Sequence, residues 1–286
     1  MRRKSRNNHL QIFTYSAVLV IFIAGFGYAS FQSFGQKAPD HYGCYNDVRQ
    51  LQTLVLFDAS EPRFNEEQAR SIRRYLDQTY NSLSFNEKFS VYTSEKDVMG
   101  SVMKARFHVC GQASGPEQLE RVNAGAAQAG YLEKQRERLY EKILSPELDA
   151  LLSATPDESR KQLFQSPILE MVSDLSRSTT LKEGGRLIIV SDLVQNSDSV
   201  KFCSVKNNMP SFTDFKQRRI YQRIKPRSLE GFDVEILMLQ RQGYGLGDLR
   251  YCKNEEEIRQ FWQDYLKANG VDNLNFIRIR QGMHSG

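Results

Sequence analysis

Two short segments of the chain are unbroken runs of apolar residues followed by an aspartate. Leu54-Val-Leu-Phe precedes Asp58, and Leu187-Ile-Ile-Val precedes Ser191 and Asp192. A short continuous apolar run is typical of a strand buried on both faces, as in a parallel sheet covered by helices. Open α/β sheets bind ligands just past the carboxyl ends of such strands. The pattern predicts that Asp58 and Asp192 lie at one sheet edge and hold a ligand there, most simply a cation.

The other predicted strands differ in how continuous their apolar residues are. Segment 234–239 is again mostly apolar, which favours a place in the middle of the sheet. Around 89–91 and 107–109 apolar and polar residues alternate, which predicts half-exposed strands near one edge. Segment 276–280 places Ile277 and Ile279 on one face, a pattern suited to an edge strand.

Helical spacing and capping signals appear between these strands. Asn65 and Gln68 form a predicted capping box that opens a helix reaching about residue 83. Residues 131–153 predict a charged helix, and Ser166-Pro167 offers a favoured N-cap and first helical residue for another. The last helix has a capping box at Asn254 and Glu257, apolar residues at helical spacing and a stop at Gly270. Residues 111–130 and 195–230 are predicted to be loops.

This order of elements predicts one α/β domain. Strands and helices alternate along about 250 residues, which is enough chain for a sizeable core. Right-handed crossovers then give a doubly wound, mostly parallel sheet with helices on both faces.

The N-terminal segment predicts a membrane anchor. Four cations in the first six residues precede an uncharged apolar stretch at 10–34, and about 20 such residues suffice to cross a bilayer. A cleaved signal peptide, with a loose small-x-small site at residues 27–29, is the alternative, although its apolar core would be only ~7–15 residues long. We expect a basic cytoplasmic tail at 1–9, a transmembrane helix at 10–34, a linker at 35–47 and an exported domain at 48–286. The protein would then be a single-pass protein of the inner (plasma) membrane.

Charge gives no support to nucleic-acid binding. The chain has a formal net charge of +5, and four of its cations lie in the basic tail, so about +1 remains for the rest. A nucleic-acid-binding domain would show a concentrated basic surface. One stretch, 212–227, does interleave six cations with aromatic and aliphatic residues. It reads either as a solvated surface helix or as a basic segment for an acidic partner or anionic lipid.

All four cysteines, Cys44, Cys110, Cys203 and Cys252, lie in the predicted exported part. An even count in an oxidising compartment permits two disulfides, with three possible connectivities. The sequence has no CxxC motif, so a zinc site is not expected.

Catalytic motifs are weak, and we expect no enzymatic activity. Asp58-Ala-Ser60 resembles the start of a haloacid-dehalogenase-type phosphatase, but that family has a second aspartate where this chain has Ser60. The Gly-x-Ser-x-Gly motif of many serine hydrolases is absent. The four histidines lie in the tail, the linker, a predicted edge strand and the C-terminus, which are poor places for a general base.

The order of elements resembles the von Willebrand factor type A domain over about residues 48–282. That family has a strand ending in Asp-x-Ser-x-Ser, a β-hairpin, a threonine-bearing loop before a helix, and a later strand ending in an aspartate. The corresponding residues here are Asp58, Ser60, Ser166 in place of the threonine, and Asp192. The third serine is replaced by Pro62, and the usual glycine after the second aspartate is Leu193.

The resemblance implies a divalent cation, Mg²⁺ or Mn²⁺, that accepts an acidic side chain from a protein partner. Carboxylate and hydroxyl oxygens suit such a cation. The simpler interpretation is that Asp58 and Asp192 only form turns and that Ser166 only caps its helix. The leading hypothesis is therefore a membrane-anchored interaction module. The alternatives are a metal-dependent hydrolase or phosphatase using the same aspartates, and a metal-free structural component of an envelope complex.

The same resemblance implies the disulfide pairing. In the type A topology the strand at 105–110 runs antiparallel to the first strand, which brings Cys110 to the edge where the chain enters at Cys44. Cys203 and Cys252 would both follow the carboxyl ends of neighbouring parallel strands. The expected disulfides are Cys44–Cys110 and Cys203–Cys252.

Overall fold

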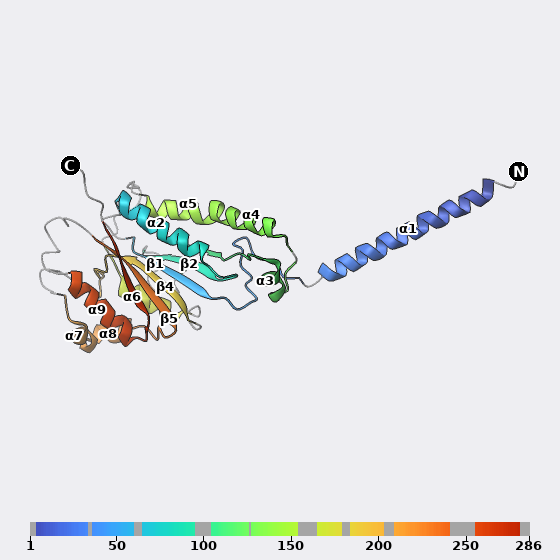
Figure 1. Ribbon diagram of the computed structural model, residues 1–286. Helices are drawn as coiled ribbons and strands as arrows, with labels where there is room; N and C mark the ends of the chain where they lie inside the picture. The colour runs from blue at the N-terminus through green and yellow to red at the C-terminus, as the bar shows by residue number, and fades with distance from the viewer. Residues whose placement is uncertain are drawn as a thin grey trace.

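A computed structural model of the protein describes residues 4–33, 36–59, 65–94, 104–125, 127–153, 165–178, 184–202, 209–240 and 255–280. A long N-terminal helix stands apart from a domain with a central sheet and helices on both sides (Figure 1). The strands are β1 (Gln52–Phe57), β2 (Lys88–Thr93), β3 (Phe107–Cys110), β4 (Gly185–Ser191), β5 (Phe232–Leu239) and β6 (Leu274–Ile279). The helices are α1 (Lys4–Ser33), α2 (Glu66–Asn81), α3 (Pro116–Arg121), α4 (Ala129–Leu139), the π-helical η2 (Tyr140–Leu144), α5 (Ser145–Leu152), α6 (Ile168–Arg177), α7 (Phe212–Gln217), α8 (Arg219–Ile224) and α9 (Glu255–Ala268).

The sheet has six strands in the order β3-β2-β1-β4-β5-β6. All neighbours are parallel except β3, which pairs antiparallel with β2. The chain builds outward from β1 through β2 to β3 and then returns to place β4 on the other side of β1. This confirms a mixed α/β fold with a mostly parallel sheet, and it puts the topological switch between β1 and β4, where the two aspartates were predicted.

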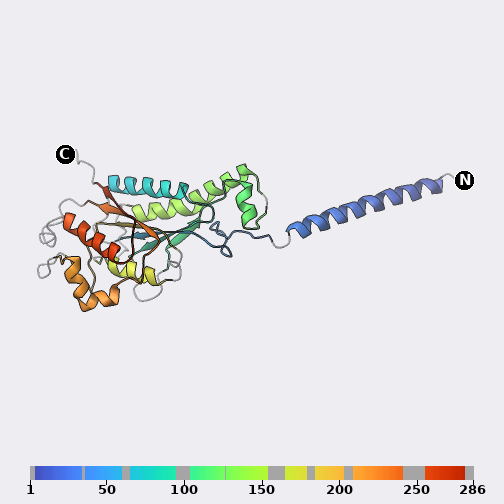
Figure 2. The same ribbon diagram turned by 60° about the horizontal axis from the view of Figure 1, so that its bottom comes forward.

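Successive side chains along each strand point to opposite faces of the sheet and pack into two separate cores. Leu54 and Leu56 of β1 belong to the core under α6, α7, α8 and α9, whereas Val55 and Phe57 belong to the core under α2 and α5. The view in Figure 2 shows helices on both sides of the sheet. β2 is buried along nearly its whole length, so the prediction that it is half-exposed was wrong. The antiparallel β3 shields it from the outer edge.

Local signals located the long helices well. The capping box at Asn65 and Gln68 is present, with the Gln68 amide donating to the Asn65 side chain at 2.9 Å. Gly270 adopts a φ of +99° after α9, and the Gly270 and Val271 amides bond back to Lys267 and Leu266, as in a Schellman motif. The second capping box, at Asn254 and Glu257, begins outside the described residues.

Two predicted loops contain short helices. α3 lies within 111–130, and its Leu119 packs with Tyr45 and Leu132 in a small third core. α7 and α8 lie within 195–230, where Phe215 and Tyr221 are buried. Each of these helices has six residues, which is too short for a helical period to appear in the sequence.

The predicted linker is fastened to the domain by a disulfide. Cys44 is bonded to Cys110 with a Cα–Cα distance of 5.1 Å, which confirms the first predicted pair. The Asp40 carboxylate accepts hydrogen bonds from the amides of Tyr42 and Cys44, both at 2.9 Å. Burial alone would raise the pKa of Asp40, but these amides and the Asn46 side chain lower it. Cys203 and Cys252 lie outside the described residues.

The helix α1 projects away from the domain in both views (Figures 1 and 2). Its large apolar side chains between residues 13 and 28 are exposed; Phe13 and Phe22 are each 75% exposed. In the described part of the chain, no helix meets the length and hydropathy needed to span a membrane. The transmembrane helix at 10–34 stays a prediction.

Candidate functional site

The ends of β1, β2 and β4 meet around Asp58. The Asp58 amide donates to the Val190 carbonyl of β4 at 2.9 Å. The next amide, that of Ala59, donates to the hydroxyl of Ser94, the residue just past β2, at 2.9 Å. The Asp58 side chain is 2% exposed. Its carboxylate is therefore fixed in a buried position at the switch point of the sheet.

Two hydroxyls from distant parts of the chain converge on this carboxylate. Ser166, from the loop before α6, donates to Asp58 Oδ2 at 2.8 Å, and Ser191, at the end of β4, donates to the same oxygen at 2.8 Å. Ser166 is 108 residues from Asp58, so only the tertiary fold brings them together. Both serines are buried. The structure thus unites two of the predicted site residues and adds Ser191, which was not predicted.

Ser166 does not cap the helix that follows it. α6 begins at Ile168, and Pro167 occupies the N-cap position without a side-chain hydrogen bond. The Leu169 amide is instead capped by the side chain of Gln195, at 2.9 Å. The prediction that Ser166 serves as N-cap was therefore wrong, and its hydroxyl is available to Asp58. The fully buried Gln195 was missed because it lies 26 residues beyond the helix start it caps.

The loop after β4 is bound tightly to α6. Besides capping the helix, Gln195 donates to Glu170 at 2.7 Å, and the Ser197 hydroxyl donates to the other oxygen of Glu170 at 2.5 Å. The backbones of Ser166 and Asn196 bond to each other in both directions. The position of Ser166 is therefore set by the same loop that follows Asp192.

Asp192 lies beside this cluster, and its carboxylate has a structural role. Its Oδ1 accepts the Val194 amide at 3.0 Å, as in an Asx turn, and the side chain is mostly buried. The Ser191 hydroxyl accepts the Leu193 amide at 2.8 Å while donating to Asp58. Ser60 lies outside the described residues. Of the four predicted site residues, Asp58 and Ser166 are therefore in direct contact. Asp192 follows Ser191, whose hydroxyl also donates to Asp58.

Leu193 takes an unusual backbone conformation for its residue type. Its φ is +64°, in the left-handed region that favours glycine. The side chain is completely buried, and its carbonyl accepts the indole N–H of Trp262 at 2.9 Å. Core packing and this hydrogen bond therefore hold a bulky residue at the position where the Asp-Gly of the type A pattern has its glycine.

Because of this backbone conformation, we expect glycine at position 193 to be less destabilising than alanine, the reverse of the usual order. Leu193→Ala removes the buried side chain but keeps the left-handed strain, so we expect a loss of about 3 kcal/mol in the free energy of unfolding. Leu193→Gly also loses the Cβ and leaves a slightly larger cavity, but it relieves left-handed strain of about 1–3 kcal/mol, so it should be the less destabilising variant. Urea unfolding of both variants checks this. Leu187, in the strand β4, supplies the control. There the glycine variant should be less stable than the alanine variant.

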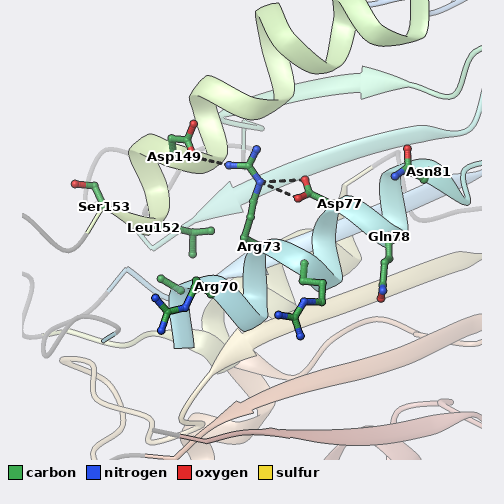
Figure 3. Close-up of a pocket in the computed structure, with 10 residues that line it drawn as sticks. Arg70, Arg73, Asp77, Gln78, Asn81, Asp149, Leu152 and Ser153 are labelled. Carbon is green, nitrogen blue, oxygen red and sulfur yellow. Dashed lines mark hydrogen bonds and ion pairs between the residues drawn. The ribbon is translucent and has the colours of Figure 1, made fainter. Parts of the chain in front are cut away.

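A cavity of about 570 Å³ lies between α2 and α5 (Figure 3). None of the predicted site residues lines it. Arg73 projects over it and bonds to Asp77 at 3.0 Å, to Ser145 at 2.7 Å and to Asp149. Burial alone would lower the pKa of Arg73, but its hydrogen bonds to Tyr140 and Asp77 outweigh burial and raise it. Arg73 therefore fastens α5 to α2, which is a structural role.

Within the described residues, one group of three metal-ligating side chains of the His, Cys, Asp and Glu types comes close together: Asp40, Cys44 and His108, with ligand atoms within 4.8 Å of one another. The Cys44 sulfur is bonded to Cys110, so this group has no thiolate to offer in the oxidised protein. It lies at the linker and is distinct from the cluster around Asp58.

No family profile and no curated protein matches the chain. Similar solved structures include the conserved hypothetical protein BatB from Bacteroides thetaiotaomicron, with 14% identity and a TM-score of 0.35 over 81% of this chain and 91% of that one. Another is an aerotolerance-related membrane protein from Bacteroides fragilis NCTC 9343 carrying multiple mutations to serine, with 12% identity and a TM-score of 0.37 over 81% and 92%.

Proposed function

We propose that the protein is a membrane-anchored interaction module of the von Willebrand factor type A kind. It would hold one Mg²⁺ or Mn²⁺ ion at the carboxyl ends of β1 and β4 and present that ion to an acidic side chain of a protein partner. The observation that carries the proposal is the convergence of the Ser166 and Ser191 hydroxyls on Asp58 Oδ2, each at 2.8 Å. The sheet order, with an antiparallel β3 beyond β2, supports it.

The donor set fits a hard cation. Asp58, Asp192 and Ser166 offer carboxylate and hydroxyl oxygens, the ligands that Mg²⁺ prefers, and Ser60 would add another hydroxyl. Mg²⁺ usually keeps several waters, so a partial protein shell leaves positions open for a partner carboxylate. When bound, the ion would supply the positive charge that recognises that carboxylate. Asp58 and the serines would orient it.

A metal-free structural role is the competing function. The observation that favours it is that Ser166 and Ser191 already donate to Asp58, while Asp192 already accepts the Val194 amide. Such a closed network stabilises the switch point without a ligand. The two functions differ in whether the folded protein responds to divalent cations.

We expect millimolar Mg²⁺ or Mn²⁺ to raise the melting temperature of the full chain in detergent. A ligand that binds only the folded state stabilises it by about 2.7 kcal/mol at a hundredfold excess over Kd. For a domain of this size that corresponds to about 5–10 °C. Differential scanning fluorimetry with and without the cation measures the shift, with Ca²⁺ as a comparison.

Two variants make this experiment specific. Asp58→Asn keeps an oxygen to accept the serine hydroxyls but removes the charge, so the cation-induced shift should disappear. Asp233→Asn removes an exposed carboxylate at the amino end of β5, the opposite end of the sheet, and should keep the shift. If neither the natural protein nor the variants respond to either cation, the metal-free structural role is the correct one.

We infer that α1 binds lipid, because its large apolar side chains are exposed along residues 13–28. The disulfide fastens the segment after α1 to Cys110, which pairs with Lys88 at the amino end of β2. The candidate cation site, at the carboxyl ends of the strands, then faces away from the anchor and toward a partner. A reporter active only outside the cytoplasm, fused after Gly286, tests the inferred orientation; a reporter that is inactive there and active in the cytoplasm contradicts it.

A further inference from the structure

A strongly basic surface lies over α7, α8 and the segment that follows them. Residues 216–227 contain six cations and no acidic residue: Lys216, Arg218, Arg219, Arg223, Lys225 and Arg227. The side chains of all six are exposed. We call these six residues the basic strip.

The apolar residues interleaved with the basic strip are buried and fix its backbone. Phe212, Phe215, Tyr221 and Ile224 all belong to the core under α6 to α9. Phe212 and Phe215 meet Phe261 of α9 edge-on, with ring centroids 5.9 and 5.5 Å apart. The surface-helix interpretation of 212–227 is thus correct for the apolar side chains. The packing also holds the six cations on a rigid frame, which lowers the entropy lost when a partner binds.

The basic strip is distinguished by its density of cations, with no acidic residue between Lys216 and Arg227. Elsewhere, six arginines pair with carboxylates: Arg70, Arg73, Arg106, Arg177, Arg186 and Arg278. Within the described residues, none of the six strip cations forms an ion pair. Arg177, which pairs with Asp174, fastens the backbone of the strip by donating to the carbonyls of Arg223 and Lys225 at 2.9 and 3.4 Å. Like charges held this close repel one another, and an acidic ligand would relieve that repulsion.

We propose that the basic strip is a docking surface for an acidic segment of a partner protein, a run of aspartates and glutamates. The position of the basic strip in the molecule favours a protein segment over a lipid surface as its ligand. α7 and α8 lie at the end of the domain remote from α1 in both views (Figures 1 and 2). The helix with exposed apolar side chains is thus at the other end, and the linker after it is held by the Cys44–Cys110 disulfide. This surface is separate from the Asp58 cluster and does not depend on a cation there.

Fluorescence anisotropy of a labelled oligoglutamate peptide with the full chain in detergent tests the proposal. We expect binding at an ionic strength of about 0.15 M that is largely lost at about 1 M, where the Debye length falls from about 8 to 3 Å. The triple variant Arg219→Glu, Arg223→Glu, Arg227→Glu should weaken binding by about tenfold or more, since several exposed ion pairs are lost together. Its melting temperature should stay within about 2 °C of the natural protein, because all three side chains are exposed.

A matched control separates this surface from net charge. The triple variant Lys134→Glu, Arg138→Glu, Lys142→Glu changes the charge equally on the exposed side of α4 and η2, where glutamates are interleaved with the cations. It should bind the peptide as the natural protein does. Equal loss in both triple variants, or no peptide binding by the natural protein, overturns the proposal. Preferential binding of phosphatidylglycerol vesicles or of an oligonucleotide through the same three arginines also overturns it.

Discussion

Replacing Trp262 by alanine is expected to lower the free energy of unfolding by about 3–5 kcal/mol, the range for a large buried aromatic residue. Trp262 is completely buried on α9 and meets Tyr265 edge-on, with ring centroids 5.4 Å apart. Its indole N–H also donates to the Leu193 carbonyl, so the loss affects both the core and the loop after Asp192. Urea denaturation of the full chain, followed by circular dichroism, measures the change.

Trp262→Phe separates the two contributions. Phenylalanine keeps most of the apolar contact with Phe261 and Tyr265 but cannot donate to Leu193, so its loss should be smaller than that of alanine. We expect Trp262→Phe to lower the free energy of unfolding by about 1–3 kcal/mol, because the buried Leu193 carbonyl loses its donor and the ring is smaller. If the alanine variant lost less than about 1 kcal/mol, the packing of α9 against the sheet described above would be wrong.

Removing the Cys44–Cys110 disulfide should lower stability by about 2–5 kcal/mol. The bond spans 66 residues and joins the linker to the edge strand β3, so its loss frees a long loop in the unfolded chain. Alanine is the better replacement at both positions, because both cysteines are buried and a serine hydroxyl would add an unsatisfied polar group. The unfolding midpoint of the double variant, compared with the natural protein in urea, measures the effect.

The second predicted pair supplies the control. Non-reducing peptide mapping of the double alanine variant should still recover Cys203 linked to Cys252. Reducing agent should lower the midpoint of the natural protein by more than that of the variant. An unchanged midpoint in the double variant would show that the linker contributes nothing to the stability of the domain.

The features that were predicted correctly are those set by residues close together in the sequence. Unbroken apolar runs identified β1 and β4 because strands buried on both faces need apolar side chains at every position. The segment predicted as an edge strand, 276–280, overlaps the edge strand β6 (Leu274–Ile279). The capping residues Asn65 and Gln68 marked the start of α2. The Cys44–Cys110 pairing followed from one feature of the topology, the antiparallel β3, which the structure confirms.

Features fixed by distant contacts were not visible in the sequence. Ser166 looked like an N-cap because it precedes a proline and a helix, yet Gln195 caps that helix from the following loop. Ser191 was read only as the end of a strand, since nothing local reveals that its hydroxyl turns toward Asp58. The left-handed backbone of Leu193 depends on Trp262, which lies 69 residues further along the chain. In each case tertiary packing decides which polar groups meet.

Direct counting of bound Mn²⁺ tests the proposed cation site most plainly. The full chain is titrated with Mn²⁺, and binding is measured as the loss of the free-ion signal in electron paramagnetic resonance. We expect one Mn²⁺ ion bound per chain and its displacement by excess Mg²⁺. The Asp58→Asn variant should bind none at the same site, whereas Asp233→Asn should bind as the natural protein does. Absence of bound Mn²⁺ in the natural protein, or equal binding by Asp58→Asn, would contradict the account and leave the Asp58 cluster a purely structural feature.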